Sequence, residues 1–194
     1  MEQVREFSRG YQQGAALEAS EFLYDSPLIR VEDEFGDYAA VSFKKNRPIL
    51  DAVLHLTERI YEDFTFDQDA TTVSTPVQSV LKRRRGVCQD FAHLQIACLR
   101  SLGLPARYVS GYVETLPSPG QEKMIGADAS HAWVSFYCHG LGWIDVDPTN
   151  NLIVSDQHVT LGWGRDYSDV SPVRGVILGS GEHTVSVAVD VQKL

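Results

Sequence analysis

The sequence predicts an α+β fold in which one buried helix packs on an antiparallel sheet or barrel. Residues 88–102 are apolar on nearly every side of a helical wheel, which is typical of a helix inside a domain. Gly103 and Pro105 then suit the end of that helix. Beyond them the apolar period changes from helical to alternating, as expected for strands.

Composition and length narrow the class of protein. With 194 residues, 43% of them hydrophobic, the chain can bury a full core. Its net charge of -9 argues against a nucleic-acid partner, which would need a basic face. No segment approaches the roughly 18 apolar residues of a membrane span, so no membrane partner is expected.

Two further features concern the cellular compartment of the protein. The N-terminus carries no apolar run of the kind that a secretion signal needs. The three cysteines are an odd number and widely spaced, which fits reduced thiols better than a disulfide framework. We therefore expect a cytoplasmic protein, whose oligomeric state the sequence leaves open.

The chain divides into an N-terminal arm, residues 1–47, packed on a core of residues 48–194. The arm shows a broken helical pattern up to residue 22 and a turn at residues 33–37. The core opens with a helix that runs from Pro48 to about Phe64. Its apolar stripe consists of Ile49, Val53, Leu56 and Ile60.

A short second helix is expected before the buried one. Thr75 would cap it, Pro76 would take the first position, and the Gln78 side chain would reach back. The basic run at residues 82–85 is best interpreted as a solvated helix end, where cations complement the helix dipole. The alternative is a positive field that holds a thiolate or a substrate carboxylate.

Alternating patterns predict several strands. They cover residues 106–114, 131–137, 143–147 and 183–191. If His139 lies at the centre of the loop that joins the second and third strands, His131 faces Asp147 directly. Both side chains then point to the same side of the sheet, because a slip of one residue would separate them.

Three side chains in this arrangement suit nucleophilic catalysis. Cys88, at the first turn of the buried helix, lies where free N–H groups favour a thiolate. His131 would take the thiol proton and Asp147 would orient the imidazole. The backbone N–H of Cys88 would stabilise an oxyanion, with Gln78 or Tyr61 as candidates for the second donor.

Simpler interpretations of these residues remain. Cys88 can be a small core residue, His131 a partly buried strand histidine and Asp147 a turn aspartate. A metal site at Cys88, His93 and Cys98 is excluded, because a spacing of five turns successive residues by about 140° away from one helix face. No metal or cofactor is expected, and His93, Cys98 and Cys138 are interpreted as packing residues.

Four blocks, in this order along the chain, resemble the core of the bacterial transglutaminase-like superfamily. They are Gly86–Ala92, Gly103–Tyr112, Ser130–Val134 and Gly142–Asn150. The resemblance implies a papain-like, transglutaminase-core fold and a Cys–His–Asp triad at Cys88, His131 and Asp147. It prefers Asp147 over Asp145, because the family's aspartate directly precedes Pro-Thr.

The same resemblance suggests a cleft between the Cys88 helix and the hairpin that carries the other two residues. The block at residues 163–167 looks like a feature of the bacterial branch. The residues expected to line the cleft are Gln89, Tyr112, Ser130, Trp133, Trp163, Arg165, Asp166 and Tyr167.

The chain also departs from the family in three ways. All three tryptophans follow Cys88, so the upstream tryptophan that serves the oxyanion hole in animal transglutaminases has no counterpart. Residues 1–47 are too short for the β-rich N-terminal domain of longer bacterial relatives. No calcium-loop pattern is visible, so calcium activation is not expected.

The predicted function is that of a cysteine hydrolase, a protease or amidase. It would cleave a peptide or side-chain amide through a thioester, and its partner would be a peptide or protein substrate. Transfer of the acyl group to an amine is the close alternative. A non-catalytic binding module of the same fold is the third.

Overall fold

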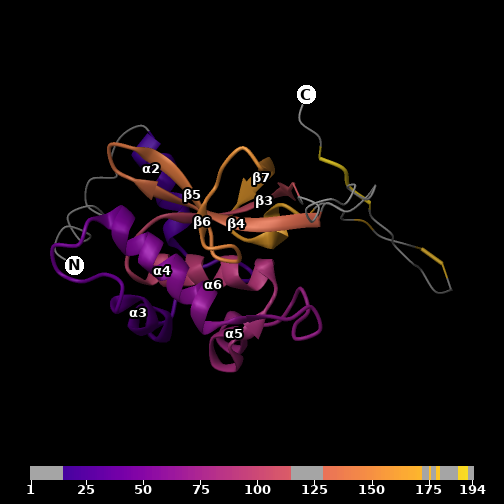
Figure 1. Cartoon of the computed structure of the whole chain (residues 1–194), viewed down its shortest axis with the longest axis horizontal. Helices are drawn as coiled ribbons and strands as arrows, with labels where there is room; N and C mark the ends of the chain where they lie inside the picture. Colours follow the sequence, from indigo (N-terminus) through magenta and orange to yellow (C-terminus); the bar gives the residue numbers. More distant parts are fainter. Residues whose placement is uncertain (1–14, 115–128, 172–174, 176–177, 180–187, 192–194) are drawn as a thin grey trace, which may run out of the picture.

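The protein forms a helical layer packed against a five-stranded antiparallel sheet in a computed structural model. The structure describes residues 15–114, 129–171, 175, 178–179 and 188–191. Helices α3 to α6 gather on one side of the sheet, and α2 lies beyond the other (Figure 1). The predicted α+β architecture is confirmed.

The helical elements are α2 (Ala15–Ser20), η1 (Glu21–Leu23), α3 (Asp33–Ala40), α4 (Ile49–Asp63), α5 (Val77–Arg83), α6 (Cys88–Ser101) and η2 (Tyr167–Asp169). The strands are β1 (Thr65–Phe66), β2 (Arg85–Gly86), β3 (Ala106–Val113), β4 (Ala129–Cys138), β5 (Gly142–Asp147), β6 (Leu152–Ile153) and β7 (His158–Gly164). The large sheet has the order β6-β5-β4-β3-β7, and β1 pairs with β2 separately.

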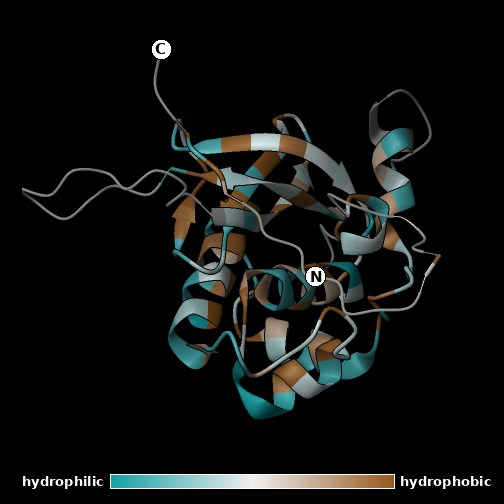
Figure 2. Ribbon diagram, turned by 90° about the vertical axis from the view of Figure 1, so that its right-hand side faces the viewer, coloured by the Kyte–Doolittle hydropathy of each residue, from teal (hydrophilic) through white to brown (hydrophobic). Residues whose placement is uncertain are grey.

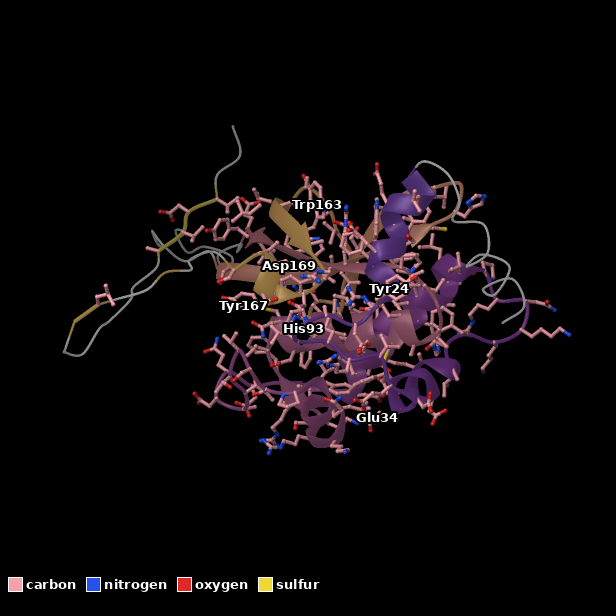
Figure 3. All side chains as sticks on the ribbon, turned by 180° about the vertical axis from the view of Figure 1, so that it is seen from behind. Tyr24, Glu34, His93, Trp163, Tyr167 and Asp169 are labelled. Atoms are coloured by element: carbon pink, nitrogen blue, oxygen red, sulfur yellow. The ribbon has the colours of Figure 1, made fainter. Side chains whose placement is uncertain are left out.

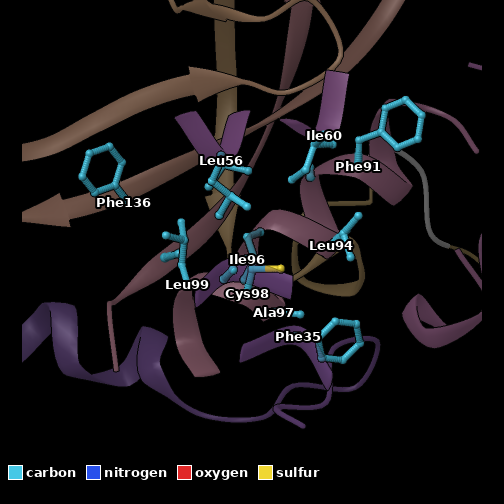
Figure 4. Packing of buried hydrophobic residues seen from close by; sticks show 14 of the residues in the cluster. Phe35, Leu56, Ile60, Phe91, Leu94, Ile96, Ala97, Cys98, Leu99 and Phe136 are labelled. Carbon is cyan, nitrogen blue, oxygen red and sulfur yellow. The ribbon is translucent and has the colours of Figure 1, made fainter. Parts of the chain in front are cut away.

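Helix α6 is the centre of the core. Every residue from Asp90 to Arg100 is buried. Its apolar side chains meet Phe35 of α3, Leu56 and Ile60 of α4, and Phe136 of β4 (Figure 4). Burial of one such side chain contributes about 1.5–3 kcal/mol. A helix without a polar face needs this cover on all sides, as the sequence predicted.

The start of α6 is fixed by a carboxylate. Asp90 Oδ2 accepts hydrogen bonds from the Val87 N–H, at 2.8 Å, and from Thr71 Oγ1, at 2.6 Å. A Cβ atom on Gly86 would lie 2.6 Å from that oxygen, so only glycine leaves room for it. These contacts place Cys88 at the first residue of the helix.

The arm contributes to the same core. The predicted turn at residues 33–37 is wrong, because α3 begins at Asp33 and runs through it. Gly36 lies on α3 where it approaches α6, and a Cβ there would be 3.3 Å from Ser101 Oγ. The glycine serves close helix packing here instead of a turn.

The predicted cap of the second helix is also wrong. Helix α5 begins at Val77, one residue later than expected, and Pro76 precedes it. Thr75 Oγ1 accepts from the Thr72 N–H, and the Gln78 side chain bonds Glu32 of the arm. The Thr-Pro pair therefore ends the preceding loop.

The β4–β5 register differs from the prediction by two residues. Cys138 pairs with Gly142 and Val134 with Val146, because the loop is centred on Gly140 and not on His139. Gly140 has φ +83°, a conformation that favours glycine. Since side chains alternate with period two, the shift leaves His131 and Asp147 on the same side.

The other predicted helices and strands were confirmed in part. The helix at Ile49–Asp63 and the strands β3, β4 and β5 are confirmed, whereas β7 was not predicted. Residues 183–187 of the predicted strand at 183–191 lie outside the described residues. So do residues 1–14 of the arm's broken helical pattern, whereas its end is helical, in α2 and η1. Outer turns of the helical layer are hydrophilic (Figure 2). Within the described ranges no helix is long and apolar enough to cross a membrane.

Candidate active site

Cys88 differs from the other two cysteines in its surroundings. It is partly exposed at the start of α6, where backbone N–H groups lack acceptors within the helix. Cys98 and Cys138 are buried, and burial raises the pKa of both thiols. The thiol most open to reaction is therefore the one at the positive end of the helix dipole.

His131 lies between this thiol and Asp147. Its Nε2 is 2.7 Å from Asp147 Oδ2, and both side chains are buried. Nε2 therefore carries a proton and donates it, which leaves Nδ1 for the thiol. Burial lowers the pKa of His131, but hydrogen bonds to Asp147 and to Cys88 outweigh it and raise the pKa to about 9.

Asp147 is fully buried, yet its charge is well compensated. Its Oδ1 accepts from the backbone N–H groups of Thr149 and Asn150, at 2.9 and 3.2 Å. Its Oδ2 accepts from His131 and from Asn150 Nδ2, at 2.7 Å each, and from His158 Nε2, at 3.2 Å. Burial alone would raise the pKa of Asp147, but these donors lower it well below its usual range.

Two of these partners were missed in the sequence. His158 opens β7, an unpredicted strand, and its side chain is 1% exposed. The alternation of Val159, Leu161 and Trp163 was the available signal for a strand that begins there. Asn150 ends the Gly142–Asn150 block that resembles the family, but no role was predicted for it.

The described residues contain one group of three potential metal ligands, namely His131, Asp147 and His158, with ligand atoms within 4.8 Å of one another. The Asp147 oxygen lies between the two rings as a shared hydrogen-bond acceptor. A metal-binding histidine normally donates its other N–H to a neighbour. His158 Nδ1 is buried without a hydrogen-bond partner. The group fits a hydrogen-bond network better than a metal centre.

Two of the residues predicted to line a cleft are buried instead. Asp166 has no exposed surface, and it accepts hydrogen bonds from the Leu28 N–H and from Ser168. Trp133 is equally buried, and its indole N–H donates to Asp145 at 3.0 Å. For both, the prediction of a cleft-lining role is wrong, because internal polar partners hold them inside.

The other predicted residues of the 163–167 block, Trp163, Arg165 and Tyr167, do not lie together. The Tyr167 N–H donates to His93 Nε2 at 3.2 Å, and these residues lie together, away from Trp163 (Figure 3). Trp163 is 55% exposed, with the Arg107 guanidinium stacked 4.5 Å from its ring. Arg165 pairs with Asp169 at 2.9 Å.

The other predicted residues are placed as follows. Tyr112 and Ser130 are paired across β3 and β4, next to the Gly111–His131 pair. Gln89 follows Cys88 and donates to the Val73 carbonyl at 3.1 Å. The predicted role of Gln78 as an oxyanion donor is wrong. Its side-chain amide donates to Glu32 on the surface, at 2.7 Å.

A comparison with protein families shows to which family the chain is related. The model of the transglutaminase-like superfamily matches residues 37–148, more than half of the chain. The chain belongs to the transglutaminase-like superfamily. The resemblance seen in the four sequence blocks is thereby confirmed.

Two bacterial proteins are among the relatives of this superfamily member. An uncharacterized protein of Mycobacterium tuberculosis is 47% identical over 178 residues, which are 89% of this chain and 57% of the relative. The chain thus spans little more than half the length of that relative. A protein-glutamine gamma-glutamyltransferase of Pseudomonas aeruginosa is 32% identical over 87 residues, 44% of this chain and 13% of that protein.

Solved structures give the same fold. A candidate cysteine protease from Cytophaga hutchinsonii superimposes with a TM-score of 0.66 at 32% identity, covering 79% of this chain and 49% of that one. The periplasmic domain of TgpA from P. aeruginosa has a TM-score of 0.52 at 24% identity, covering 70% and 48%. The second likeness concerns the fold alone.

Proposed function

We propose that this superfamily member is a cysteine hydrolase that cleaves a peptide or side-chain amide through a thioester, with Cys88, His131 and Asp147 as its triad. The observation that supports it most is the orientation of His131. Its Nε2 is engaged by Asp147, so Nδ1 is left to exchange a proton with the Cys88 thiol.

The proposed reaction has two halves. The Cys88 proton passes to His131 Nδ1 while sulfur attacks the amide carbon, and the Cys88 N–H stabilises the oxyanion. His131 then protonates the leaving amine, the C–N bond breaks and a thioester remains. In the second half, water gives a proton to His131 and attacks the thioester, which releases the acid and restores the thiol.

Transfer to an amine is the second candidate, and one relative supports it. The Pseudomonas protein that shares 32% identity is a glutamyltransferase. An amine in place of water would attack the same thioester and form a new amide. Ammonia release from a glutamine peptide, with and without incorporation of an added amine, distinguishes the two outcomes.

Location stays a prediction. A cytoplasmic site was expected from the sequence, whereas the TgpA structure is a periplasmic domain. Fractionation of cells that express the full-length protein would assign the compartment.

The first test is the rate at which iodoacetamide alkylates each cysteine between pH 5 and 9, followed by mass spectrometry. We expect Cys88 to react at pH 6 at least about 10-fold faster than a free thiol with a pKa near 8.5. His131→Ala should abolish that advantage, because the imidazole no longer accepts the thiol proton.

The matched control is His139→Ala, which removes an exposed histidine from the β4–β5 loop. It should leave the alkylation of Cys88 unchanged. If Cys88 reacts as slowly as Cys98 and Cys138 in the wild-type protein, the binding-module interpretation replaces the enzyme.

A further inference from the structure

The proposed triad leaves one buried polar side chain next to it without a role. His158 comes from β7, on the opposite side of β3 from the strand that carries His131. Its Nε2 lies 3.2 Å from Asp147 Oδ2, the same oxygen that His131 contacts at 2.7 Å. One carboxylate oxygen therefore serves two histidines.

The hydrogen bond fixes the tautomer of His158. An ionised carboxylate only accepts, so His158 Nε2 must carry the proton. Nδ1 is buried with no hydrogen-bond partner, and a second proton there would have no acceptor. His158 therefore donates to Asp147 through Nε2 and makes no hydrogen bond at Nδ1, whereas Nδ1 of His131 exchanges a proton in the proposed reaction.

The ring of His158 is also held in place. It packs edge-on against Trp133, with centroids 5.2 Å apart, and lies 6.0 Å from the ring of His131. Trp133 is itself fixed by its bond to Asp145. Because the His158 ring is held in this way, its N–H can keep the Asp147 carboxylate in one rotamer. His158 needs no contact with a substrate to do so.

We propose that His158 is a positioning residue that holds Asp147 and shares its charge with His131. The inference rests on the proposed function, since it concerns the same site. By donating to Oδ2, His158 withdraws part of the negative charge that would otherwise stabilise the protonated form of His131. Among the described residues, the titratable groups around Asp147 are His131 on β4 and His158 on β7, with Cys88 of α6 beyond His131 and Asp145 beyond Trp133.

The test compares His158→Phe with His158→Gln. Phenylalanine keeps an aromatic ring against Trp133 but lacks the N–H donor, whereas glutamine supplies a donor and lacks the ring. The measurement is the NMR titration of the His131 imidazole, made in a Cys88→Ala background so that it does not depend on catalysis. We expect His158→Phe to raise the pKa of His131 by about 0.5–1 unit, and His158→Gln to restore most of the original value.

An unchanged or lower pKa of His131 in a folded His158→Phe protein overturns the proposal and leaves His158 a packing residue. So does stoichiometric metal that is bound by the wild-type protein and lost in His158→Phe, measured by mass spectrometry. The proposed function is tested by a different measurement, the alkylation rate of Cys88. The two ideas therefore fail in different experiments.

Discussion

At the scale of single residues, Gly86 controls where the reactive helix begins. A side chain at this position would collide with Asp90, whose carboxylate bonds the Val87 N–H and Thr71. We expect Gly86→Ala to lower the free energy of unfolding by about 1–3 kcal/mol, because the buried carboxylate loses donors. Urea denaturation measures the change.

The control for this variant is Gly175→Ala, since a Cβ at Gly175 would meet nothing within 4 Å. It should change the stability by less than about 0.5 kcal/mol. If Gly86→Ala is equally neutral, the close approach of Asp90 does not determine the start of α6.

At the scale of elements, one arginine ties the end of α6 to three other segments. The Arg100 guanidinium donates to the carbonyls of Ala106, Tyr24 and Arg165 at 2.6–3.1 Å. It is 3% exposed, and burial lowers its pKa to about 10. This side chain connects the arm, β3 and the segment after β7 around one helix end.

Loss of this guanidinium should be costly for the fold. We expect Arg100→Met to lower the free energy of unfolding by about 2–4 kcal/mol, because three carbonyls lose a charged donor. Thermal and urea unfolding would measure it. Arg83→Met, at the exposed end of α5, is the matched variant and should have little effect. Equal losses in the two variants would contradict the assigned role of Arg100.

The elements also show what the sequence could reveal. Helix α6 was predictable because it is apolar on nearly every side, and the strands β3, β4 and β5 because their apolar residues alternate regularly. The β4–β5 register was off by two, since the loop centre depends on the positive φ of Gly140, which the pattern does not show. His158 was missed and Asp166 was misplaced because each has a partner on another segment, Asp147 for His158 and Leu28 for Asp166. Spacing along the chain carries no information about such contacts.

At the scale of the whole molecule, a buried histidine links stability to pH. His93 accepts a hydrogen bond from the Tyr167 N–H, and burial lowers its pKa to about 4. In the unfolded chain the pKa is near 6.5, so the unfolded state binds more protons between pH 6.5 and 4. The stabilisation is complete above pH 6.5 and is lost as the pH falls through that range.

We therefore expect the wild-type protein to lose up to about 3 kcal/mol between pH 7 and 4 through this group. His93→Gln, which keeps an acceptor for Tyr167, should lose less over the same range. Guanidinium unfolding at pH 7, 5.5 and 4.5 makes the comparison, with carboxylate titration common to both proteins. Parallel curves would show that His93 takes no part in acid unfolding.

Trp133 has a consequence for observing the site in solution. Its indole is fully buried, 6.2 Å from the ring of His131 and 5.2 Å from the ring of His158, the two histidines that share Asp147. A protonated imidazole quenches indole emission far more than a neutral one. The intrinsic fluorescence of this chain therefore contains an optical reporter of proton movement at His131, one that requires neither a substrate nor a label.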